Sequence, residues 1–132
     1  MVSNLMAEAL RIWLVEPEPM LQDILLDLFA MEEIEVNSVA SVVDVWQASL
    51  TGGDGAVVLD TRVLADLSAS EQAAMLQQLT QHMPLVLLYD VAVPVKSNFP
   101  VSDGARALAW PLDLDELVST VREVAATRVT AS

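Results

Sequence analysis

The sequence predicts an α/β domain in which helices cover both faces of a parallel five-stranded sheet. Short apolar runs typical of buried strands alternate with amphipathic helical patterns five times in about 120 residues. A helix that connects one strand to the next in this way favours parallel pairing of the two strands. The length of 132 residues and the apolar content of 54% fit one domain with its own core.

The first half of the chain contains two strand–helix units. Residues 10–15 (LRIWLV) are typical of a short buried strand, and the acidic, proline-containing segment 16–19 ends it. Apolar residues at i, i+3, i+4, i+7 and i+8 predict a helix over 21–29. Residues 34–36 alternate apolar and polar side chains, as on an exposed edge strand. Ser41 is expected to cap a second helix, which carries Val42, Val43, Trp46 and Leu50.

The middle of the chain contains the clearest strand and the clearest helix start. Residues 56–59 (AVVL) form a continuous apolar run, typical of a strand that is covered on both faces, and the run ends at Asp60. Ser68 and Glu71 have the spacing of a capping box, in which the two residues satisfy each other's backbone N–H groups. We therefore expect a third helix that begins after Ser68 and ends before Pro84.

The last third of the chain adds two strands and a closing helix. Residues 85–88 and 107–110 are the expected strands, and apolar spacing predicts the helix over 114–125. Two prolines and a glycine within 91–104 leave room there only for a short or broken fourth helix. We expect an N-terminal extension, one domain and a flexible tail, at residues 1–9, 10–126 and 127–132.

Composition excludes several classes of function. The chain has no cysteine, which excludes a disulfide framework, a thiol nucleophile and a zinc–cysteinate site. No apolar run reaches the roughly 18 residues that a membrane helix needs, and no signal-peptide pattern is present. The net charge of −13 argues against direct binding to nucleic acids or anionic lipids. A soluble, cytoplasmic domain is the expectation.

The candidate site lies where the strands end. In parallel α/β sheets, functional groups gather beyond the carboxyl ends of the strands. Acids that converge there suit Mg²⁺, but an aspartate that accepts a phosphoryl group also needs a hydroxyl and an ammonium group. The only lysine, Lys96, lies in the irregular stretch, so we expect no cationic side chain to line this crevice. The residues that this strand-end rule places at the site are Glu16, Glu18, Asp60, Tyr89, Asp90 and Trp110.

Four segments stand in the order and spacing of a known family. They are LRIWLVEPEP at the first strand, AVVLD at the third, PLVLLYD at the fourth and GARALAWPLDLDEL before the last helix. Together they resemble the receiver domain of response regulators, in the CheY-like superfamily, over essentially residues 10–126. The resemblance implies a sheet of strand order 2-1-3-4-5 and a role in two-component signal transduction. It also places Asp60 at the position of the phosphoacceptor.

The same resemblance shows what this chain has lost. The acidic pair of the family falls on Glu16 and Pro17, so the second metal-binding acid is missing, and Glu18 is at most a partial substitute. Tyr89 stands where the fourth strand normally carries serine or threonine. The lysine before the last proline is Trp110, or is deleted. We therefore predict a pseudo-receiver, not an enzyme, that phosphoryl transfer does not switch.

Two interpretations of these residues stay open. In the first, Asp60 is a vestigial phosphoacceptor that caps nearby backbone, Tyr89 and Trp110 fill the former pocket, and no metal or cofactor is bound. In the alternative, the domain is a conventional phosphoacceptor in which Glu16 and Asp60 hold Mg²⁺. A small ligand in the altered pocket is a further possibility, whereas a flavodoxin-like cofactor site is a poor match to the EPEPM segment.

The expected partner is a protein. The segment that begins at Val91 is apolar and contains a proline. Exposed apolar surface of this kind usually marks a docking site. Folding of this loop back over the core is an equal possibility. Receivers commonly use this region with the fifth strand and the last helix for dimers and effectors. We therefore expect a homodimer, or docking on a partner or output domain that regulates transcription. The candidate interface residues are Val91, Val93, Val95, Phe99, Ala107, Leu108 and Glu116.

Overall fold

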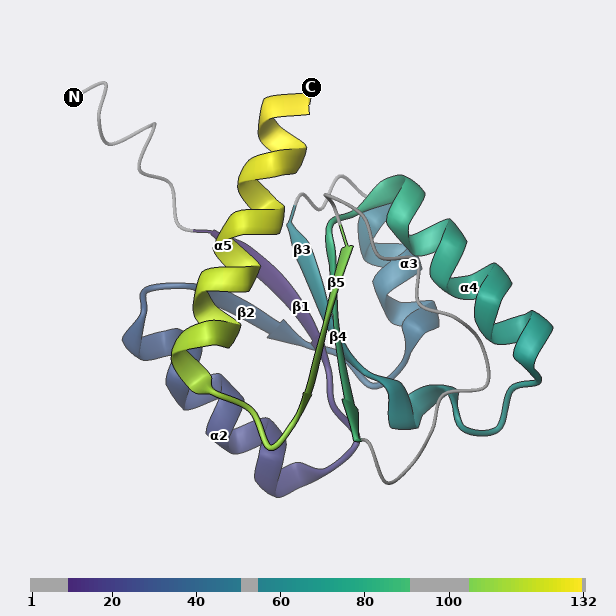
Figure 1. Cartoon of the computed structure of the whole chain (residues 1–132), viewed down its shortest axis with the longest axis horizontal. Coiled ribbons are helices and arrows are strands. Elements are labelled where there is room, and N and C mark those ends of the chain that lie inside the picture. The colour runs from purple at the N-terminus through teal and green to yellow at the C-terminus, as the bar shows by residue number, and fades with distance from the viewer. Residues whose placement is uncertain (1–9, 51–54, 91–104, 132) are drawn as a thin grey trace.

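The computed structural model is a three-layer α/β domain, and it describes residues 10–50, 55–90 and 105–131. A five-stranded sheet lies between two layers of helices (Figure 1). The strand order is β2-β1-β3-β4-β5, and each neighbouring pair of strands is parallel. The predicted fold class and strand order are therefore confirmed.

The elements follow the sequence patterns closely. Each helix that connects two parallel strands crosses one face of the sheet, as the pairing requires. In chain order the elements are β1 (Arg11–Val15), α2 (Pro19–Met31), β2 (Glu35–Ser38), α3 (Val42–Leu50), β3 (Ala56–Asp60), the 3₁₀ turn η1 (Thr61–Leu64), α4 (Ala69–His82), β4 (Leu85–Asp90), β5 (Ala105–Trp110) and α5 (Leu114–Ala131).

Apolar side chains form one core on each side of the sheet. Helices α2 and α5 cover one face, and α3 and α4 cover the other (Figure 1). Because successive strand residues point to opposite faces, Leu14 joins the core under α2 and α5, whereas Val15 joins the core under α3 and α4. All five residues of β3 are buried, which explains its uninterrupted apolar run and isolates its last residue, Asp60, from water.

Polar caps define where the helices begin. Ser68 and Glu71 form the predicted capping box: the Ser68 Oγ accepts from the Glu71 N–H at 3.2 Å, and the Glu71 carboxylate accepts from the Ser68 N–H at 2.9 Å. The Ser41 Oγ accepts from the Asp44 N–H at the start of α3, as expected. These side chains satisfy N–H groups that have no partner within the helix.

Gly55 allows β3 to start close against β1. Its φ of +149° is one that other residues rarely adopt, and a Cβ here would clash with the backbone carbonyl of Arg11. The next residue, Ala56, pairs with Ile12, and the register continues to Val15 and Leu59. This start therefore fixes which residues meet at the other end of the two strands.

Some boundaries differ from the expected ones. Strand β5 starts at Ala105, before the predicted residue 107, and α5 continues to Ala131, past the predicted helix end at residue 125. Residues 1–9 and the segment 91–104, with its expected short or broken helix, lie outside the described residues. Within the described ranges, no helix combines the length and the apolar character needed to cross a bilayer.

Candidate functional site

Two buried carboxyl groups lie at the carboxyl ends of adjacent strands. Asp60 is the last residue of β3, and Glu16 directly follows β1. Because Val15 pairs with Leu59, the residues that follow each of them come out at the same edge of the sheet. Glu16 is 5% exposed and Asp60 is 0% exposed, so both have lost nearly all contact with water. Burial without partners is costly for a carboxylate, which makes the neighbours of these two groups decisive.

Asp60 caps the turn that follows it. Its Oδ1 accepts a hydrogen bond from the Arg62 backbone N–H at 2.9 Å, which makes Asp60 the N-cap of η1. This is the capping role that the sequence left open for this residue. The second oxygen, Oδ2, is buried and has no donor among the described residues. The Oδ1 of the carboxylate is thus engaged, whereas the buried Oδ2 has no hydrogen-bond donor among the described residues.

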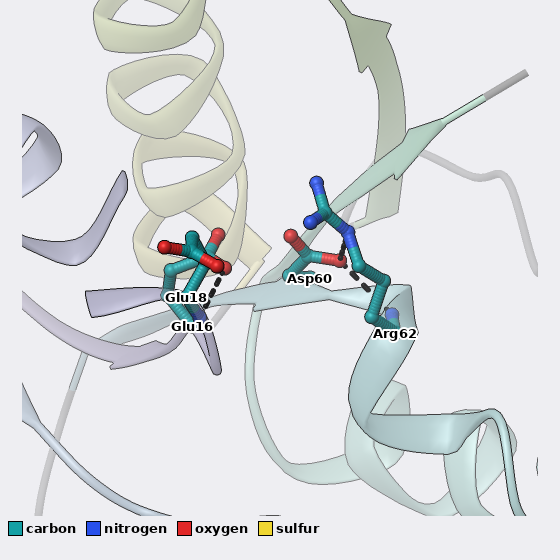
Figure 2. A network of polar contacts seen from close by, with 4 residues as sticks. All are labelled: Glu16, Glu18, Asp60 and Arg62. Atoms are coloured by element: carbon teal, nitrogen blue, oxygen red, sulfur yellow. Dashed lines mark hydrogen bonds and ion pairs between the residues drawn. The ribbon is translucent and has the colours of Figure 1, made fainter. Parts of the chain in front are cut away.

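A guanidinium group lies beside the same carboxylate. The Arg62 Nε is 3.4 Å from the Asp60 Oδ1, an ion-pair contact that adds to the backbone hydrogen bond (Figure 2). The expectation that no cationic side chain lines the crevice is therefore wrong. The reason is local: η1 turns the chain directly after β3, so the side chain two residues beyond Asp60 comes back alongside it.

Sequence reasoning missed Arg62 because it looked for a cation at the ends of strands four and five. The sequence pattern that could have indicated Arg62 lies within three consecutive residues. Asp60 precedes a turn, and an aspartate that caps a turn places the backbone, and with it the side chain, of the residue two positions later beside its own carboxylate. The pattern Asp-Thr-Arg directly after a buried strand was therefore sufficient to suggest this pair.

Glu16 is the other half of the cluster. Its Oε2 accepts from the Glu18 backbone N–H at 3.1 Å, and its Oε1 is buried with no donor among the described residues. Burial raises the pKa of Glu16 to about 8, and the Asp60 carboxylate acts in the same direction, both as an acceptor for a protonated Glu16 and through its negative charge. The Glu18 N–H and the Arg62 charge favour ionised Glu16 and lower the pKa, but they are outweighed.

A proton on Glu16 explains how the two carboxyl groups coexist. A neutral Glu16 can donate its O–H to the Asp60 carboxylate, whereas two ionised carboxylates have no proton to share between them. With Glu16 neutral, the negative charge of Asp60 is balanced by the positive charge of Arg62.

The remaining predicted site residues lie at or just after the carboxyl ends of β1, β4 and β5. Pro17 and Glu18 are exposed, and Glu18 contributes its backbone N–H to Glu16. Tyr89 is half-buried near the end of β4, where it pairs with Ala109. Trp110 is half-buried at the end of β5 and packs against the core under α2 and α5; its indole N–H is buried and has no acceptor in the described part of the chain.

The expected interface residues are only partly described. Ala107 and Leu108 are half-buried and pack against opposite cores, because they are neighbours on one strand. Glu116 is exposed in the first turn of α5. The other four, Val91, Val93, Val95 and Phe99, lie outside the described residues.

The donor set does not suit a divalent cation. Mg²⁺ prefers several oxygen ligands of high negative charge, and Pro17 offers no side-chain oxygen. Arg62 places a positive charge next to Asp60, where it would repel a metal ion. In the described ranges, no group of three or more His, Cys, Asp or Glu side chains is arranged to hold a metal. The cluster is built to compensate its own charge.

Comparison with solved structures identifies the fold. The chain superposes with a TM-score of 0.68 on a response regulator receiver protein from Sinorhizobium medicae, at 20% identity over 92% of this chain and 98% of that one. It superposes with a TM-score of 0.69 on a receiver domain from Clostridium thermocellum, at 15% identity over 93% and 99% of the two chains.

A third similar structure is the receiver domain of a sensor histidine kinase from Pseudomonas aeruginosa, which has a magnesium ion coordinated in its active-site cleft. The TM-score is 0.68, at 16% identity over 89% of this chain and 98% of that one. Neither a protein-family model nor a curated protein sequence matches the chain. The chain thus has the response-regulator receiver, or CheY-like, fold.

Proposed function

We propose that this chain is a receiver-like signalling domain that regulates a protein partner without being phosphorylated. The observation that supports this most is the state of Asp60: its Oδ1 is already engaged by the Arg62 N–H and by the Arg62 guanidinium. A carboxylate oxygen that is held in this way is a weaker nucleophile toward a phosphodonor.

The neighbouring residues support the same proposal. Phosphoryl transfer relies on groups that position the phosphoryl oxygens and neutralise their charge. By its resemblance to receiver domains, this chain has Tyr89 in place of a small hydroxyl residue, and the lysine is replaced by Trp110 or deleted. Accordingly, the proposed role is that of an interaction module and not of an enzyme.

The proposed output is a contact with another protein in the cytoplasm. Dimerisation through the face formed by β5 and α5, or docking on a partner or output domain that regulates transcription, is the form that we propose. The net charge of −13 supports a protein partner over a nucleic acid or an anionic membrane. Sedimentation over a range of concentrations tests dimerisation, and a monomer at every concentration would leave only a heterologous partner.

One observation favours the alternative, a conventional Mg²⁺-dependent phosphoacceptor. Glu16 Oε1 and Asp60 Oδ2 both lack donors in the described structure, and such oxygens are available to a metal ion. The similar Pseudomonas aeruginosa receiver domain holds magnesium in its cleft. In this alternative, Glu16 and Asp60 would be the metal ligands and Asp60 the acceptor.

Intact-mass measurement separates the two proposals. The chain is incubated with Mg²⁺ and a small phosphodonor such as acetyl phosphate, beside Asp60→Asn and a receiver domain that has the complete set of site residues. We expect a phosphoryl adduct on the complete receiver and none on this chain. An adduct on the wild type that Asp60→Asn abolishes would establish the alternative.

A further inference from the structure

Arg62 differs from the other arginines in what it pairs with. Each of the four arginines whose side chains the structure describes makes an ion pair. Three of the acidic partners, Glu35, Glu123 and Glu32, have side chains that are 53%, 61% and 39% exposed. The side chain of Asp60 is 0% exposed. Only at Asp60, within the described ranges, does an arginine compensate a carboxylate that water cannot reach.

We propose that the Arg62 guanidinium is a built-in counter-ion that takes the place of a divalent cation beside Asp60. The receiver fold implies a metal ion at this edge of the sheet, and the donor set here does not suit one. A positive charge that belongs to the chain supplies the compensation that a buried carboxylate requires. This inference rests on the function proposed above, because a domain that is not phosphorylated does not need a metal ion.

The counter-ion is held in position from two directions. Asp60 accepts from the Arg62 backbone N–H, so the carboxylate itself fixes the start of η1. From the other side, Gln72 on α4 is 2% exposed, and its Nε2 donates to the Leu64 carbonyl oxygen at 2.9 Å. Leu64, the last residue of η1, is itself 1% exposed in the core. The turn that carries Arg62 is therefore anchored to buried structure at both of its ends.

The positive charge of the guanidinium opposes the binding of a metal ion to the same carboxylate. The Arg62 Nε lies 3.4 Å from the oxygen of Asp60 that it contacts, so a divalent ion on the same carboxylate would be a few ångströms from a like charge. In a buried site such repulsion is screened much less than in water. Removing the positive charge of Arg62 should therefore uncover a cation site that the wild-type chain closes.

Titration with Mn²⁺, followed through the electron paramagnetic resonance signal of the free ion, tests this inference. The proteins are the wild type, Arg62→Gln, and Arg106→Gln as the matched control, because Arg106 pairs with an exposed acid, Glu123. We expect Arg62→Gln to bind one Mn²⁺ at least about tenfold more tightly than the wild type, since one like charge is removed from beside a buried carboxylate. Arg106→Gln should match the wild type.

Two more variants assign the effect to this carboxylate and to charge. Adding Asp60→Asn to Arg62→Gln should abolish the gained binding, and Arg62→Lys, which keeps the charge, should bind as the wild type does. Wild-type binding as tight as that of Arg62→Gln, or an equal gain in Arg106→Gln, would overturn the inference. If Arg62→Gln does not fold, the wild type and Arg62→Lys still test the inference, because tight Mn²⁺ binding by either protein would contradict a built-in counter-ion.

The inference and the proposed function can fail separately. A phosphoryl adduct that forms on the wild type in EDTA would contradict the proposed function and leave the counter-ion in place, since Arg62 would then supply the positive charge. An adduct that requires Mg²⁺, together with tight Mn²⁺ binding by the wild type, would overturn both.

Discussion

Two ion pairs of the same chemistry occupy very different surroundings in this domain. Arg62 pairs with Asp60 at 3.4 Å, and Arg106 pairs with Glu123 at 3.1 Å. The arginine side chains are similarly exposed, at 35% and 31%, but the acids are 0% and 61% exposed. The burial of the acid therefore decides what each pair contributes. Loss of the exposed pair should cost little stability, whereas the buried Asp60 carboxylate needs the positive charge of Arg62 to compensate its own.

The surroundings also differ in what lies beyond each pair. Glu123 faces water on a helix surface, so solvent compensates its charge if Arg106 moves away. Asp60 has a second buried carboxyl group, Glu16, as its other neighbour, and Asp60 helps to raise the pKa of that group. The negative charge of the two carboxyl groups at the sheet edge is therefore reduced by a proton on Glu16 and balanced by the guanidinium of Arg62. Three predictions test this contrast.

The largest expected effect is on the pH dependence of stability. The pKa of Glu16 is about 8 in the folded protein and near 4.5 when unfolded, so between these values the native state binds more protons than the unfolded state. The free energy of unfolding should therefore fall as pH rises from about 5 to 9, with a slope of at most about 1.4 kcal/mol per pH unit. The total decrease over this pH range is at most about 5 kcal/mol.

Glu16→Gln should remove most of this decline, because glutamine keeps a hydrogen-bonding side chain and cannot ionise. Urea unfolding at pH 6, 7, 8 and 9 measures it, with Glu116→Gln as the control at an exposed glutamate. Parallel curves for the wild type and Glu16→Gln would show that Glu16 is not protonated in the folded state.

The next effect is the direct comparison of the two arginines. Arg62→Gln leaves a buried carboxylate without its cation and should lower the free energy of unfolding by about 1–3 kcal/mol. Arg106→Gln disrupts an exposed pair and should cost less than about 1 kcal/mol. Urea unfolding at pH 7 in low salt measures both. Equal losses would mean that burial of the acid does not distinguish the pairs.

The smallest effect is that of salt on the same two variants. At 1 M salt the screening length falls to about 3 Å, which weakens attraction between exposed charges. The cost of Arg106→Gln should then approach zero, a change of about 0.5 kcal/mol or less. The cost of Arg62→Gln should persist, because Asp60 is shielded from the salt solution. Loss of both effects in salt would place Asp60 in contact with solvent.

The parts of the fold that local sequence determines were predictable. The apolar run before Asp60, and the spacing of Ser68 and Glu71, indicate a buried strand and a capped helix without knowledge of any distant residue. The order of the strands needed the resemblance to receiver domains, because alternation of strands and helices alone fits more than one parallel sheet.

The cluster itself was only half predictable. Asp60 and Glu16 follow from the rule that site residues lie at strand ends, but the position of Arg62 depends on η1 turning directly after β3. The proton on Glu16 depends on burial and on the distance between two strands, which no local pattern contains. Sequence reasoning therefore identified the acids of the site and missed what compensates them.

A carbon-13 NMR titration of the Glu16 side-chain carboxyl group tests most directly whether this cluster balances its own charge. The carboxyl signal is followed from pH 4 to pH 10 in metal-free buffer and assigned with Glu16→Gln. The structure predicts a midpoint at about 8. A midpoint close to 4.5, the ordinary value of a glutamate, would mean that two charged carboxylates share the buried edge of the sheet, and would contradict the account.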